Sequence, residues 1–97
     1  MDVKLIKLVT GEEILAEVIS SDDNTITIGN AVAAVLQPSR DGALTVGFIP
    51  WGTLSKQNKV IGMSQVVYTS IPEEDVRNQF ASMFSGIVTP PKTLITG

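Results

Sequence analysis

The chain has 97 residues, the size of one domain, with 43% hydrophobic residues, 18% charged residues and a formal net charge of −3. It contains neither cysteine nor histidine, which excludes disulfides, thiolate catalysis, a Ser-His-Asp triad and the commonest zinc sites. The acidic balance argues against broad binding to nucleic acid through phosphate neutralisation, so we expect no DNA partner.

Nothing in the sequence has the pattern of a catalytic, metal-binding or cofactor-binding site. We therefore predict a protein that is not an enzyme, with no catalytic residue, metal ligand or cofactor. No basic and apolar N-terminal segment resembles a signal peptide, and the longest apolar run, residues 31–36, is too short to span a bilayer. We expect a cytoplasmic protein with no membrane partner.

The first part of the chain predicts a β-hairpin. Residues 3–9 and 13–19 are predicted strands joined at Thr10-Gly11, where glycine can adopt the positive φ of a tight turn. In the second strand Ile14, Ala16 and Val18 form a clean apolar face, whereas the face with Glu13, Leu15 and Glu17 is mixed.

A polar turn at residues 20–24 separates this hairpin from the clearest strand signal in the chain. Residues 25–28 alternate strictly between threonine and isoleucine. Gly29-Asn30 then predicts a bulge or sharp bend before the apolar residues 31–36. Such a bend allows one long strand to serve both sides of a closed sheet.

The next segments predict a second hairpin and a last strand. Asp41-Gly42 is a strong hairpin signal before a strand at residues 44–48. Residues 53–59 are polar and predict a loop. A last strand is expected within residues 60–71, interrupted around residues 62–65.

The hydrophobic period changes to that of a helix near residue 70. Ser70 and Glu73 fit a capping box, and Pro72 suits the first turn. One apolar stripe follows, formed by Val76, Phe80, Met83, Phe84 and Ile87. This pattern predicts a C-terminal amphipathic helix over residues 72–86, and residues 87–97 are expected to form an extended tail.

About five short, sharply turned strands are too few for a sandwich and suit a small, strongly bent barrel. We therefore predict a mainly β fold: a single domain over residues 1–97, with a small, strongly bent five-stranded barrel over residues 1–71, which the resemblance described next makes SH3-like. The helix is expected to cover an open end or a face of that barrel.

The order of short motifs resembles an Sm-like (LSm-type) protein of the group encoded by tailed phages and cyanophages. The opening segment at residues 8–18, the pair Pro50-Trp51, the C-terminal helix and the segment at residues 86–90 are similar to that group. The resemblance implies an Sm-like barrel whose copies assemble into a homo-oligomeric ring, located in the host cytoplasm if the chain is phage-encoded.

The resemblance also implies two RNA-facing loops. In Sm rings, two conserved loops meet to clamp a base of single-stranded RNA. The positions that match these loops, and are therefore candidate RNA-facing residues, are Asp22, Asn24, Thr25, Gly62, Met63 and Ser64. Thr25 stands where the family has its base-contacting asparagine, and the arginine of the second motif is absent. For Asp22 and Asp23, a turn rich in local hydrogen bonds is the alternative interpretation.

Two functions therefore stay open. The first is a non-catalytic Sm-like ring that binds single-stranded RNA through the pore-facing loops. The alternative is a structural or protein-interaction module that has lost RNA recognition. Trp51, Val66 and Tyr68 are candidate subunit-interface residues, although Trp51 is equally suited to anchor a loop. Lys4, Lys7, Lys56 and Lys59 would form a basic patch if the first strand and the polar loop lie close together.

Overall fold

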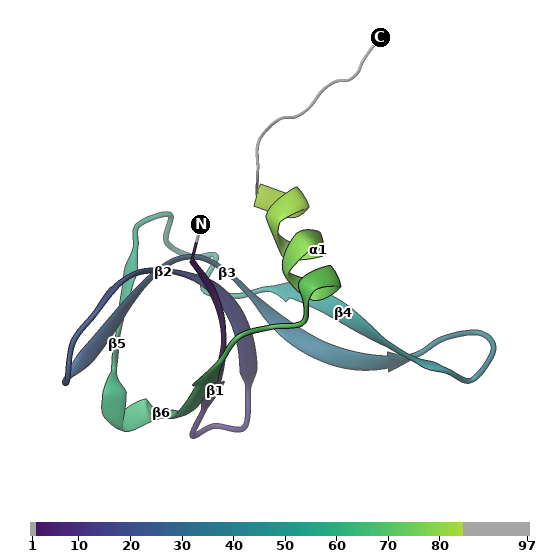
Figure 1. Ribbon diagram of the computed structural model, residues 1–97, viewed down its shortest axis with the longest axis horizontal. Helices are drawn as coiled ribbons and strands as arrows, with labels where there is room; N and C mark the ends of the chain where they lie inside the picture. The colour runs from purple at the N-terminus through teal and green to yellow at the C-terminus, as the bar shows by residue number, and fades with distance from the viewer. Residues whose placement is uncertain (1, 85–97) are drawn as a thin grey trace, which may run out of the picture.

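The computed structural model describes residues 2–84 and has a mainly β fold with one antiparallel sheet and one C-terminal helix (Figure 1). The predicted tail at residues 87–97 lies outside the described residues. In chain order the elements are β1 (Val3–Leu8), β2 (Glu13–Ser21), β3 (Thr25–Pro38), β4 (Leu44–Pro50), β5 (Lys59–Gly62), the 3-10 turn η1 (Met63–Gln65), β6 (Val66–Ser70) and α1 (Glu74–Phe84).

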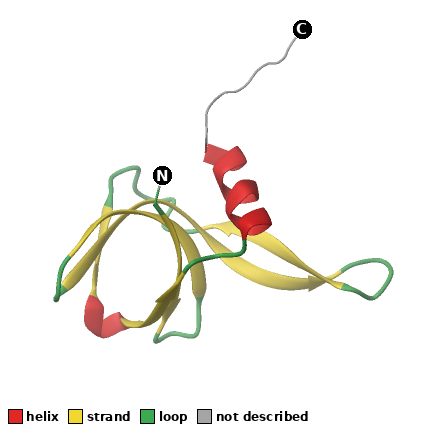
Figure 2. Cartoon of the chain, viewed as in Figure 1, coloured by secondary structure: helices red, strands yellow, loops and turns green. Residues whose placement is uncertain are grey.

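The sheet has six strands, so the prediction of five is wrong in number. Its order is β4-β3-β2-β1-β6, and β5 pairs with the first half of β3. The predicted last strand is divided by η1 into β5 and β6, which pair with different strands. Figure 2 shows the sheet curling strongly, so that β5 and β6 approach each other through η1. Among residues 2–84, η1 rather than a strand ladder links them.

The bend in β3 falls at Gly29-Asn30, as predicted. Ala16 pairs with Ala31 and Val18 pairs with Ile28, so β3 has one more residue than β2 between these two pairs. This is a β-bulge, which increases the local twist and bends the strand. On one side of the bulge β3 pairs with β5, and on the other side it pairs with β4.

Both predicted glycine turns occur. Gly11 has φ of 96° and its N–H donates to the Leu8 carbonyl at 2.9 Å. Gly42 has φ of 87° and its N–H donates to the Ser39 carbonyl at 3.0 Å. These positive φ values are strained for residues with a Cβ, which explains why both turns use glycine.

The curled sheet buries apolar side chains on both of its faces. On the inner face the buried residues are Ile6, Leu8, Ile14, Ala16, Ile26, Ile28 and Ala31. On the outer face Phe80 of α1 packs with Val3, Leu15 and Val32, and Val76 and Phe84 support it. The helix therefore covers the outer face of the sheet.

Two details of the predicted helix are corrected. Ser70 is the last residue of β6 and pairs with Leu5, and the first helical hydrogen bond runs from Arg77 N–H to the Glu73 carbonyl at 2.9 Å. Ser70 therefore does not cap the helix. Met83 was predicted on the apolar stripe, but it is 49% exposed. Ile87 lies outside the described residues.

The packing of α1 predicts that Phe80→Ala strongly destabilises the protein. Phe80 is completely buried, and truncating a buried phenylalanine typically costs about 3–5 kcal/mol. Urea unfolding followed by circular dichroism measures the change. Met83→Ala is the matched control in the same helix and is expected to change stability by less than about 1 kcal/mol. Equal effects of the two variants would contradict the assigned packing of α1.

Candidate functional site

The two predicted RNA-facing loops meet in the structure. Thr25 pairs with Gly62 across β3 and β5, and the Met63 N–H donates to the Asn24 carbonyl at 2.8 Å. We call residues 22–25 and 62–64 the paired loops. The loops are about 40 residues apart in the sequence, and the long first half of β3 brings them to one end of the curled sheet.

Asp22 organises the first of these loops. Its Oδ1 atom accepts hydrogen bonds from the N–H groups of Asn24 and Thr25, both at 2.8 Å. The bond from Asn24, followed by that from Thr25, lowers the pKa of the Asp22 carboxyl. The carboxylate therefore holds the turn, which is the alternative that the sequence left open.

The remaining residues of the paired loops differ in exposure. Asn24 and Ser64 are exposed, whereas Thr25, Gly62 and Met63 are partly buried. Met63 packs against the inner core. The paired loops contain no lysine or arginine, and Asp23 adds a second exposed carboxylate beside Asp22. Their polar contacts to a ligand would come from Asn24 and Ser64.

The three candidate interface residues lie in different surroundings. Trp51 and Val66 are half-buried and pack against the inner core, and the Trp51 Nε1 atom donates to Glu12 Oε2 at 3.2 Å. Trp51 therefore anchors the start of the loop after β4. Tyr68 is 44% exposed on β6, and its hydroxyl donates to Glu13 Oε2 at 3.1 Å.

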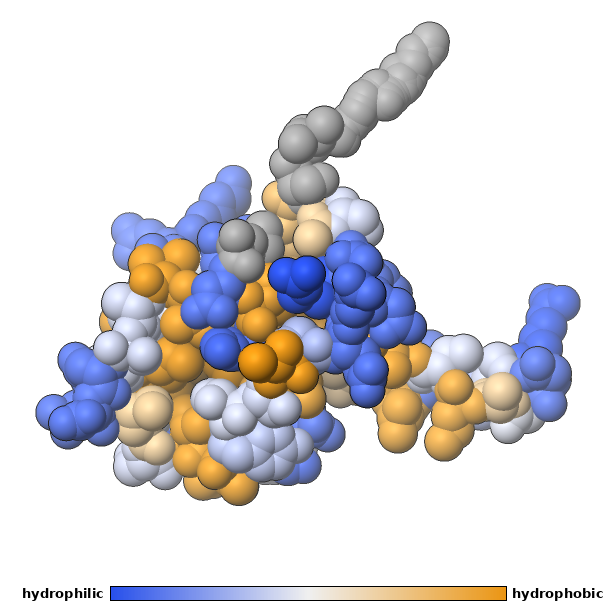
Figure 3. Space-filling view, in the orientation of Figure 1, coloured by the Kyte–Doolittle hydropathy of each residue, from blue (hydrophilic) through white to orange (hydrophobic). Residues whose placement is uncertain are grey.

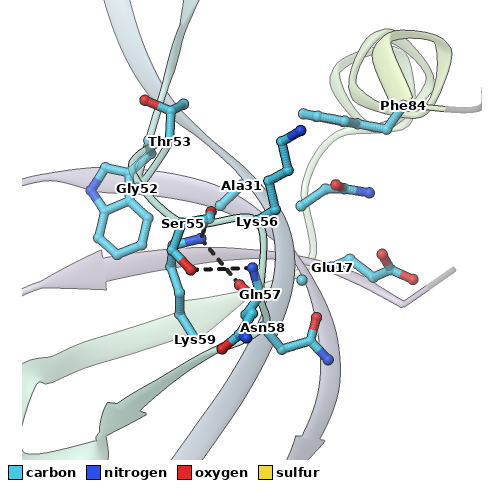
Figure 4. Close-up of a pocket in the computed structure, with 13 residues that line it drawn as sticks. Glu17, Ala31, Gly52, Thr53, Ser55, Lys56, Gln57, Asn58, Lys59 and Phe84 are labelled. Atoms are coloured by element: carbon cyan, nitrogen blue, oxygen red, sulfur yellow. Dashed lines mark hydrogen bonds between the residues drawn. The ribbon is translucent and has the colours of Figure 1, made fainter.

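Sequence reasoning missed a polar pocket beside this loop. The loop between β4 and β5 and the bulge of β3 enclose about 340 Å³ (Figure 4). Asn30, Lys56, Gln57 and Asn58 line it, with Glu17 on the opposite side. The polar run Gln57-Asn58 could have indicated a polar surface on this loop. The sequence does not show that the loop lies beside the bulge at Gly29-Asn30 and near Glu17 of β2.

The four lysines that would form a basic patch do not all line one hollow, and isolated surface lysines were the favoured interpretation. Lys56 and Lys59 line the polar pocket, whereas Lys4 lies in a separate hollow with Arg77. The Lys59 ammonium donates to the Ser55 carbonyl at 3.0 Å, so it holds the loop.

Within residues 2–84, no cluster of acidic side chains could hold a metal ion. In the same part of the chain, α1 is too short to cross a bilayer, and no other helix could do so. The sequence matches no protein-family model and no curated protein.

The bond between Tyr68 and Glu13 predicts a measurable titration. The hydrogen bond to Glu13, with some desolvation and the Glu13 charge, raises the pKa of Tyr68 above its ordinary value. The stability that this bond contributes is therefore present below about pH 10 and is lost as the pH rises through the raised pKa. Tyr68 is the only tyrosine, so ultraviolet absorbance reports its titration directly.

Glu13→Gln should lower the pKa of Tyr68 because it removes the charge that opposes ionisation. Glu12→Gln is the control, since Glu12 accepts from Trp51 and not from Tyr68. An unchanged Tyr68 pKa in Glu13→Gln would show that this bond is not formed in solution.

Proposed function

We propose that this chain is an Sm-like self-assembly module, whose copies form a homo-oligomeric ring by pairing the edges of their sheets. The curled sheet is, in this proposal, the SH3-like barrel of that family. The carrying observation is the sheet order, which leaves β4 at one end and β6 at the other. Unpaired edge strands invite pairing with another chain, and ring closure satisfies them without an open-ended fibre.

The side chains of the two edges support this role. Val67 on β6 is 59% exposed, and Ile49 on β4 is 49% exposed. Natural edge strands are usually protected by charged side chains or proline. β6 (Val66–Ser70) has no charged residue, and β4 (Leu44–Pro50) has only Pro50 at its end.

A second candidate function is the binding of single-stranded RNA, and the meeting of the paired loops favours it. In a ring, each copy would place Asn24 and Ser64 at an equivalent position. The charge of these loops opposes this function, because lysine or arginine neutralises phosphate charge and the paired loops contain neither. We therefore place assembly first and RNA binding second.

The ring proposal predicts a light-scattering mass several times the mass of one chain. Val67→Lys should reduce that mass, because a charge on an edge strand disfavours edge-to-edge pairing. Leu54→Lys is the matched control, since Leu54 is 105% exposed in the loop between β4 and β5. A monomer at micromolar concentration would exclude the ring.

Fluorescence anisotropy with labelled oligo-U and oligo-A separates the two functions. We expect neither RNA to bind, even at low ionic strength where electrostatic attraction is strongest, since the paired loops carry carboxylates and no cation. Binding that Asn24→Ala abolishes would favour the RNA function. Asn30→Ala is the matched control, because Asn30 lies in the polar pocket and outside the paired loops.

A further inference from the structure

One end of the β3–β4 hairpin extends beyond the rest of the sheet (Figure 1). The pairing of β2 with β3 ends at Ala33, so from Ala34 onward β4 is the only strand paired with β3 within residues 2–84. We call residues 34–48 the β-arm. A two-stranded ribbon is marginally stable in water unless another element packs against it.

The β-arm exposes apolar side chains on the face that also carries α1. Leu36 and Leu44 are 69% and 66% exposed, and Val46 is 37% exposed. Leu36 pairs with Val46, and two residues earlier Ala34 pairs with Phe48, which packs beside Phe80 of the helix. Side chains two residues apart share a face of a sheet. The apolar surface therefore continues from the helix along the β-arm, and Figure 3 shows orange side chains on the arm.

A groove lies between the start of α1 and the base of the β-arm. It encloses about 400 Å³, and its apolar lining comes from Leu5, Leu15, Ala34, Leu36, Val46, Pro72 and Val76. Its charged residues are Glu13 and Glu73. Glu74 and Asp75 add negative charge in the first turn of the helix. An occupant of this groove needs apolar side chains and a cation.

The tip of the β-arm has this combination. Arg40 is exposed, and it is the only lysine or arginine between Lys7 and Lys56. The neighbouring Asp41 is engaged within the tip, where its carboxylate accepts hydrogen bonds from Ser39 Oγ and from the Ala43 N–H. Arg40 is therefore available in the turn that joins the strands of Leu36 and Leu44, where it can meet a carboxylate outside the tip.

We propose that the β-arm of a second copy of this chain occupies the groove. Leu36, Leu44 and Val46 of one copy then pack on the groove of the other, and Arg40 meets Glu13 and Glu73. The groove and the β-arm lie on one face, so a two-fold axis between two copies makes both contacts at once. This surface goes beyond the edge pairing proposed above, which uses β4 and β6 backbone.

Charge reversal tests this contact most directly. Arg40→Glu and Glu73→Arg, each alone, should raise the dimer dissociation constant by at least about tenfold in sedimentation velocity, because like charges then face each other. The double variant should bind more tightly than either single variant, because the carboxylate at position 40 then faces a cation at position 73, while Glu13 still repels it and keeps the affinity below that of the wild type. Single variants with unchanged dissociation constants, or a double variant as weak as the singles, would overturn the proposal.

The apolar part of the contact has its own test. Leu44→Ser should weaken the dimer, whereas Leu54→Ser, which changes a still more exposed leucine in the loop between β4 and β5, should not. Circular dichroism checks that each variant folds. Equal effects of the two variants would count against the β-arm contact.

A covalent test does not depend on charge. The chain has no cysteine, so a mixture of Arg40→Cys and Glu73→Cys proteins allows selective cross-linking with a short bis-maleimide. We expect a cross-linked pair that contains one of each variant, and its absence would contradict the arrangement.

Val67→Lys separates this contact from edge pairing. If Val67→Lys abolishes all self-association and the β-arm variants have no effect, edge pairing is the sole contact between copies and the β-arm proposal is wrong.

Discussion

The structure depends on the burial of β2 on both of its faces. Ile14 and Ala16 point to the inner core, while Leu15 between them is equally buried against the outer face. A single sheet can enclose only one of these faces by curling. The other face needs a second layer, and α1 provides it by placing Phe80 against Leu15. The helix is thus required because Leu15, although it lies on the mixed face of β2, is buried as fully as the residues of the clean apolar face.

The length of β3 explains the rest of the architecture. Its bulge at Gly29-Asn30 turns one strand of 14 residues into two segments with different partners. The first segment, paired with β5, brings Asn24 and Met63 into contact. The second segment pairs with β4 and extends beyond its last residue paired with β2, Ala33, to form the β-arm. The paired loops and the exposed β-arm are therefore two consequences of the same strand.

Local patterns in the sequence predicted the parts that local physics decides. The turns at Gly11 and Gly42, the bulge in β3 and the two faces of β2 depend on neighbouring residues, and these predictions hold. Pairings between distant segments were harder to predict from the sequence. The turn η1 has only three residues, so β5 and β6 look like one interrupted strand although they pair with different strands. Met83 has the spacing of the apolar stripe but lies at its margin. At such a position the spacing does not determine whether the side chain is buried, because burial depends on how the helix packs on the sheet. The β-arm and the groove could not be foreseen, because the exposure of Leu36 and Leu44 follows from where β2 begins, opposite Ala33 of β3.

The distribution of charge connects the site with the proposed assembly. The paired loops carry Asp22 and Asp23, so a ring would gather one pair of carboxylates from each copy at one end of the sheet. Such a cluster repels phosphates. Several exposed apolar side chains lie elsewhere, with Ile49 and Val67 on the sheet edges and Leu36, Leu44 and Val46 along the β-arm, and their burial needs another protein surface. This distribution of charge and apolar surface therefore supports the proposal that copies of the chain contact each other rather than nucleic acid, and in that proposal Arg40 orients the contact.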